Sequence, residues 1–114
     1  NVREHKVFKR DGDNIRITVP VTFAEAALGG QIEVPTLDGK SVTMKVPAGS
    51  NSGRTLRLKG RGVKTKNKTG DLLVTLEIVV PQNLTKEAKQ AVEAFAAATT
   101  GEDPRVRLTA DAKL

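Results

Sequence analysis

The sequence predicts a mainly β domain: a two-layer, antiparallel β-sandwich-like fold with a short helix between strands and a C-terminal helix. Short segments of alternating apolar and polar residues recur through the first 80 residues. Four of these segments end at a Val-Pro pair, at Val19, Val34, Val46 and Val80, and proline cannot donate to a sheet ladder. Beyond Pro81 the apolar residues change to helical spacing. Since a small sheet must cover one face to be stable, we expect two layers.

The first elements are two strands and a short helix. Residues 7–10 resemble a strand end, followed by the turn of residues 11–14 and a second, alternating strand that we expect Pro20 to end. Thr22 and Glu25 have the spacing of a capping box, in which each side chain accepts from the other residue's amide. The glycine pair after Leu28 predicts that this helix stops early.

The middle of the chain predicts a hairpin and two further strands. Residues 31–34 and 41–46 flank the Asp-Gly turn of residues 37–40, and Asp-Gly tolerates the positive φ that tight hairpins require. Residues 55–58 alternate again, residues 60–70 predict an exposed, mobile loop, and residues 72–80 form the longest apolar stretch.

The last part of the chain predicts one amphipathic helix. Leu84, Ala88, Val92 and Phe95 follow helical spacing, with Thr85 as the expected N-cap. This face would cover its own sheet or contact a second subunit, and the pattern alone favours neither. The polar tail of residues 101–114 lacks periodicity, so we expect it to be loose.

Composition argues against enzymatic chemistry. The 114 residues include no cysteine and one histidine, His5, which leaves almost no material for thiol catalysis, a catalytic triad or a histidine-cysteine metal site. No apolar run reaches the length of a membrane span or signal peptide. We therefore expect a cytoplasmic binding module that is not an enzyme and does not associate with membranes.

The net charge of +6 comes from one segment. Residues 39–70 contain no acidic residue, and they contain nine basic ones: Lys40, Lys45, Arg54, Arg57, Lys59, Arg61, Lys64, Lys66 and Lys68. Such a segment is typical of a surface for nucleic acid or acidic polypeptide, or of a solubilising face. Because no aromatic residue here could stack on bases, nucleic acid is the less favoured partner.

Several segments together resemble the substrate-binding C-terminal region of the DnaJ family of J-domain co-chaperones. The resemblance covers residues 3–98, and its most specific segments are residues 19–30, 32–39, 46–49, 56–62 and 70–74. It implies a linker strand from a preceding β domain at 1–12, the second C-terminal β domain at 13–82, and a dimerisation helix at 83–100. The tail lies outside it.

The resemblance also implies a function and its partners. Other DnaJ modules are absent from the sequence: it has no His-Pro-Asp motif of a J domain and no cysteine repeats of a zinc module. We therefore expect a fragment without its own cofactor, any zinc lying in another module of the parent protein. The implied partners are unfolded polypeptides, a second copy of the chain and, through the full-length protein, a DnaK-type chaperone of the stress response.

The resemblance places candidate site residues on two elements. The client groove beside the short helix would involve Ile17, Val19, Ile32 and Val34, to which an extended client adds as a strand, although all four also suit a core. The dimer contact would involve Leu84, Ala88, Val92 and Phe95. The alternative function is a basic β domain that binds nucleic acid through residues 39–70.

Overall fold

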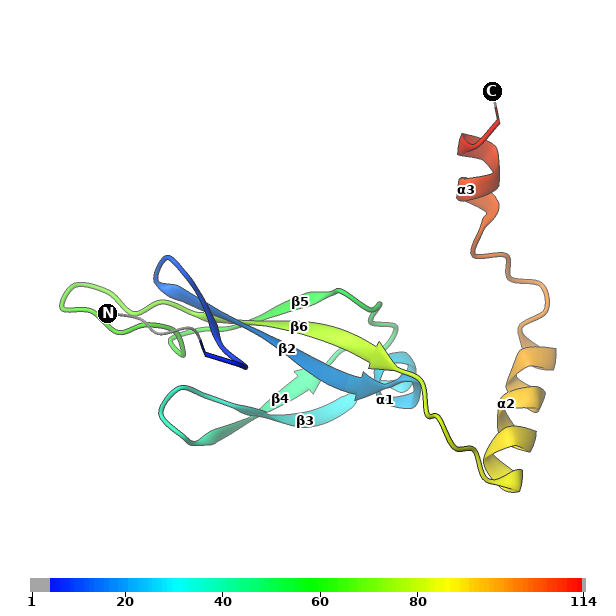
Figure 1. Ribbon diagram of the computed structural model, residues 1–114, viewed down its shortest axis with the longest axis horizontal. Helices are drawn as coiled ribbons and strands as arrows, with labels where there is room; N and C mark the ends of the chain where they lie inside the picture. The colour runs from blue at the N-terminus through cyan, green and yellow to red at the C-terminus, as the bar shows by residue number, and fades with distance from the viewer. Residues whose placement is uncertain (1–4, 114) are drawn as a thin grey trace. The chain divides into compact units, whose positions relative to one another are not determined.

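The computed structural model describes residues 5–113. Along the chain they divide into two compact units, the first ending at Val80 and the second beginning at Pro81. The first unit contains six strands and one helix: β1 (Lys9–Asp11), β2 (Asn14–Thr22), α1 (Phe23–Leu28), β3 (Gly30–Pro35), β4 (Ser41–Val46), β5 (Thr55–Leu58) and β6 (Leu72–Val79). The second contains α2 (Lys86–Ala98) and α3 (Val106–Asp111). The mainly β class predicted from the sequence is confirmed (Figure 1).

The β unit has two sheets. One has the order β1-β2-β6-β5, and the other is the antiparallel hairpin β3-β4 (Figure 1). The central pair, β2 and β6, is parallel over eight residues of each strand, so the antiparallel arrangement expected for most of the fold does not extend to this pair. Alternation of apolar residues shows which face of a strand is buried but not its direction relative to a neighbour.

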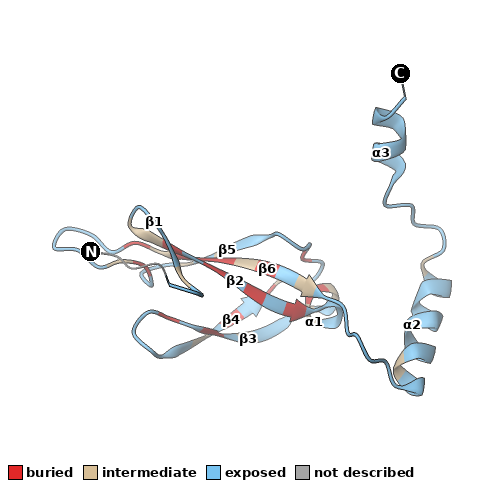
Figure 2. Ribbon diagram, viewed as in Figure 1, coloured by how far each residue is buried: buried red, intermediate tan, exposed pale blue. Residues whose placement is uncertain are grey.

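The core lies between the two sheets (Figure 2). Alternate residues of β2 are buried from Ile15 to Val21, and they pack with buried residues of the hairpin, of β6 and with Ala26 of α1. Leu72, Val74 and Leu76 of β6 belong to this core, and Leu73 on the opposite face of the strand is buried outside it. An uninterrupted apolar run is typical of such a central strand.

Pro20 does not end its strand, contrary to the prediction. It lies inside β2, opposite Glu77 of β6. Strand β1 pairs only with Asn14–Arg16, so the later part of β2 is a sheet edge on that side. An edge accommodates proline because no ladder hydrogen bond is needed there.

Two further expectations need correction. The middle of the 101–114 tail forms α3, which the pattern missed because Val106, Leu108 and Ala110 alternate without helical period.

The loop of residues 60–70 is exposed over most of its length, but Gly62 and Gly70 at its base are buried. That base is held by backbone hydrogen bonds to neighbouring segments.

Candidate binding surfaces

The four residues predicted to line a groove lie together in the core. Ile17, Val19 and Val34 are buried, with exposed fractions of 3%, 9% and 0%. Ile32 is half-buried and packs against the same cluster. A ligand would therefore reach three of these side chains only if the two sheets separated.

At a strand edge, a ligand can pair with unpaired backbone N–H and C=O groups instead of side chains. The open edge of β2 presents few free N–H groups. The Ile15 amide donates to the backbone carbonyl of Asp71 at 2.9 Å, so the N–H of Ile15 points toward β6 and away from the open edge. Residues two positions apart on a strand face the same way, so Thr18, Pro20 and Thr22 face the open edge. Pro20 has no N–H, and the Thr22 amide donates to the Glu25 carboxylate at 2.9 Å. Only Thr18 therefore offers an amide to a ligand along this edge.

The two outer edges of the hairpin also differ in how many backbone N–H groups they offer to a ligand. The Thr36 amide donates to the Lys40 carbonyl at 2.8 Å, which makes these two residues a hydrogen-bonded pair. From this register, the groups that point outward alternate along each strand. On β3 they belong to Gln31, Glu33 and Pro35, and on β4 to Ser41, Thr43 and Lys45. The edge of β4 alone therefore presents three N–H and three C=O groups.

Accessible apolar side chains lie on α1, where the sequence did not predict site residues. Phe23 is 51% exposed and Leu28 is 80% exposed, while Ala26 between them is buried. The capping box is present as predicted, since the Thr22 hydroxyl accepts from the Glu25 amide at 3.1 Å. The helix is too short for a periodic pattern to show which of its apolar residues would be exposed.

In the second unit, the predicted apolar stripe lies at the surface of α2. Leu84, Val92 and Phe95 are 45%, 53% and 50% exposed, and Ala88 is half-buried. Leu84 precedes the helix, because Thr85 is the N-cap and accepts from the Ala88 amide at 3.1 Å. The structure thus brings Ala88, Val92 and Phe95 onto one helix face, with Leu84 just ahead of it.

The hairpin turn carries one perturbed carboxylate. The Thr36 hydroxyl and the Lys40 backbone amide both donate to the Asp38 carboxylate, the amide from 3.0 Å. These hydrogen bonds, helped by the charges of Lys40 and Arg61, lower the pKa of Asp38 below its usual value. Asp38 therefore stays ionised in neutral solution.

Within residues 5–113, no group of three or more histidine, cysteine, aspartate or glutamate side chains is arranged to hold a metal ion. None of the helices described has the length and apolar character needed to cross a bilayer.

The described chain contains two layers of sheet around an aliphatic core, a capped six-residue helix, an amphipathic helix and the short helix α3. A family model described as the DnaJ C terminal domain matches residues 1–81. The chain therefore belongs to the DnaJ C-terminal domain family.

Relatives with the name Chaperone protein DnaJ agree with this family. DnaJ 1 of Streptomyces coelicolor is 56% identical over 99% of this chain. DnaJ 2 of Mycolicibacterium paratuberculosis and DnaJ 1 of Mycobacterium tuberculosis are 56% and 52% identical over 92% of it. The chain spans only 27–29% of the length of these relatives.

Proposed function

We propose that this chain binds unfolded polypeptide clients and joins two copies of its parent co-chaperone. In that role it would act with a DnaK-type ATPase chaperone, which other parts of the parent protein would engage. The chain would need no cofactor of its own, and any zinc would belong to another module. Family membership supports this function, and the observation that carries it is the open edge of β4.

The edge of β4 suits an unfolded chain because it recognises backbone and not sequence. An extended client that adds as a third strand would pair with the outward groups of Ser41, Thr43 and Lys45. The open edges of β2 and β3 each lose a donor to proline, at Pro20 and Pro35. Clients would therefore add beside β4, while buried Ile17, Val19 and Val34 and half-buried Ile32 stay in the core between the sheets.

Dimerisation would use the exposed stripe of α2. Leu84, Val92 and Phe95 are each about half exposed, and large apolar side chains of this kind are costly to leave in water. A second copy of the chain would cover it, with Leu84, Ala88, Val92 and Phe95 as the contact residues.

Proline substitutions on the two edges of the hairpin test client binding. Thr43→Pro removes an outward N–H of β4, and Glu33→Pro removes one from β3, so neither breaks the ladder between the strands. Binding is measured by fluorescence anisotropy with a labelled protein kept unfolded by reduction and alkylation. We expect Thr43→Pro to weaken binding about tenfold, equivalent to 1.4 kcal/mol.

Glu33→Pro is the matched control and should change the affinity less than about twofold, since a few tenths of a kcal/mol is typical of a surface change. Thermal unfolding of both variants checks that the hairpin is intact. Absence of binding to the unmodified chain would refute client binding. Equal losses in the two variants would refute the choice of the β4 edge.

A further inference from the structure

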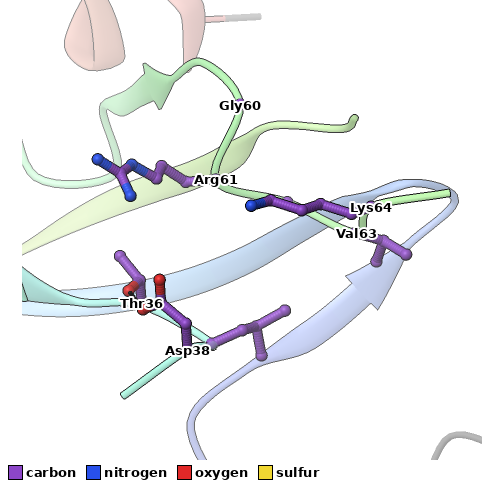
Figure 3. A pocket seen from close by; sticks show the side chains of 8 residues that line it. Thr36, Asp38, Gly60, Arg61, Val63 and Lys64 are labelled. Carbon is purple, nitrogen blue, oxygen red and sulfur yellow. Dashed lines mark hydrogen bonds between the residues drawn. The ribbon is translucent and has the colours of Figure 1, made fainter. Parts of the chain in front are cut away.

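A cavity of about 340 Å³ lies between two segments of the β unit that the client-binding proposal does not use. One wall is the β3-β4 turn with Thr36, Leu37 and Asp38, and the other is the loop after β5 with Arg61, Val63 and Lys64 (Figure 3). The two walls are far apart in the sequence and meet only in the folded unit. The cavity has room for one or two side chains of a bound partner.

The loop wall is fixed to the sheet. Three backbone hydrogen bonds of 2.9 Å hold it: the Gly62 amide donates to the Gly70 carbonyl, the Gly70 amide to the Val63 carbonyl, and the Val63 amide to the Asp13 carbonyl. A Cβ on Gly70 would lie 1.8 Å from the Asp13 carbonyl oxygen, so only glycine permits this approach. Val63 itself packs against the core. The residues beside it are therefore held in place before any ligand arrives.

The turn wall is also fixed. The Thr36 side chain is buried beneath the turn, and its hydroxyl lies 2.8 Å from the Lys40 carbonyl oxygen. Leu37 remains 48% exposed at the rim of the cavity. An apolar side chain of a partner could therefore contact Leu37 and Val63 without displacing either.

Two cations at this cavity have no ion-pair partner among the described residues. Elsewhere in the basic segment, Arg57 and Lys68 are neutralised by carboxylates at 3.4 and 2.9 Å. Arg61 and Lys64 form no such pair. Both are exposed, and in Figure 3 they lie across the cavity from Asp38. Neither charge is held in an ion pair, although the Arg61 charge already helps to lower the pKa of Asp38.

We infer that this cavity is a second binding site, specific for an acidic segment of a polypeptide that carries an apolar residue among its carboxylates. Carboxylates of the segment would pair with Arg61 and Lys64, and its apolar side chain would lie against Leu37 and Val63. This site lies at the turn and does not require strand addition to β4, so it does not depend on the proposed client binding.

Two features favour an acidic peptide over nucleic acid. The cavity contains the ionised carboxylate of Asp38, which would repel a continuous phosphate backbone passing over it. The basic segment also has no aromatic residue on which a base could stack. A peptide can place an uncharged residue opposite Asp38, whereas a nucleic acid strand cannot omit a phosphate.

Binding of a designed peptide tests the site. The probe is fluorescein-labelled Gly-Asp-Glu-Leu-Asp-Glu-Gly, measured by anisotropy at low salt against the 114-residue chain. We expect Arg61→Ala and Lys64→Ala each to weaken binding about fivefold or more, as expected for charge-assisted contacts. Lys45→Ala is the matched control: it removes one charge from the same basic segment, but at the far end of β4 from the turn. It should have less than about a twofold effect.

Two further arms separate the alternatives. A probe with Asn and Gln in place of Asp and Glu should bind at least about tenfold more weakly, and Leu37→Ala should weaken the original probe. Thr43→Pro should leave peptide binding unchanged, so failure here is distinguishable from failure of client binding. Unchanged affinity in the Arg61 and Lys64 variants would overturn the inference. The inference would also be overturned if an oligothymidine strand bound more tightly than the peptide and the same two variants abolished that binding, because the site would then bind nucleic acid.

Discussion

Individual residues of the β unit show how closely its segments approach. Gly70 touches the backbone of Asp13, where an added Cβ would lie at 1.8 Å. Neither partner is the far end of a flexible side chain, so the contact cannot relax cheaply. This glycine was visible in the sequence only as part of a loop, because a close approach between distant segments leaves no local pattern.

Gly70→Ala should therefore destabilise the β unit. We expect a loss of about 1–3 kcal/mol in the free energy of unfolding, the usual range for overpacking, measured by urea denaturation. Gly30→Ala is the control, since a Cβ there meets no atom within 4 Å. Equal stability of the two variants would show that the loop base is not packed as described.

Asp38 should make stability depend on pH in a defined direction. Folding lowers its pKa, chiefly through the hydrogen bond from Thr36. The unfolded chain therefore takes up this proton first as the pH falls, and the stabilisation present at neutral pH is lost below about pH 4. Urea unfolding at several pH values should show Asp38→Asn less stable than the unmodified chain at pH 7, with the difference vanishing in acid. A difference that is constant with pH would contradict this assignment.

At the scale of elements, the sequence predicted what local chemistry determines. The capping box of α1, the Asp-Gly turn and the N-cap of α2 all depend on residues within a few positions of one another. The parallel pairing of β2 with β6 joins residues 57 positions apart, so strand alternation could not reveal it. Burial of Ile17, Val19 and Val34 follows from that pairing and from the hairpin stacked on it.

The capping box should contribute measurably to the β unit. Thr22→Ala removes the acceptor for the Glu25 amide and should cost about 1 kcal/mol, measured by urea unfolding. Thr85→Ala removes the equivalent cap of α2. Because α2 belongs to the other compact unit, this control should reduce helix content while the β-unit amide signals unfold at an unchanged urea concentration. A shift of both transitions by Thr85→Ala would contradict the division into units.

For the whole molecule, the sequence predicted the class, the family resemblance and the helix stripe, but not the surfaces now proposed to bind clients and acidic peptides. The open edge of β4 exists because the hairpin has no third strand in the described chain. The cavity exists because the fold brings Leu37 and Arg61 together. Neither arrangement could be inferred from residue periodicity, since both depend on contacts between elements.

Assembly of two copies can be tested on α2. Val92→Glu places a charge within the exposed stripe and should convert a dimer at tens of micromolar into a monomer, because burying an unpaired carboxylate is costly. Gln90→Glu adds the same charge about 200° around the helix and should leave the dimer intact. Sedimentation equilibrium measures both. A strictly monomeric unmodified chain, or a dimer unaffected by Val92→Glu, would refute this contact.

Client binding, as proposed above, adds an unfolded polypeptide as a strand to the outer edge of β4. Amide hydrogen exchange, followed by NMR with and without a saturating unfolded client, observes that edge directly. Strand addition at β4 predicts slower exchange for the outward amides of Ser41, Thr43 and Lys45, and little change for Gln31 and Glu33 on the opposite edge. Unchanged exchange along β4 in the presence of bound client, or protection confined to β3, would contradict it.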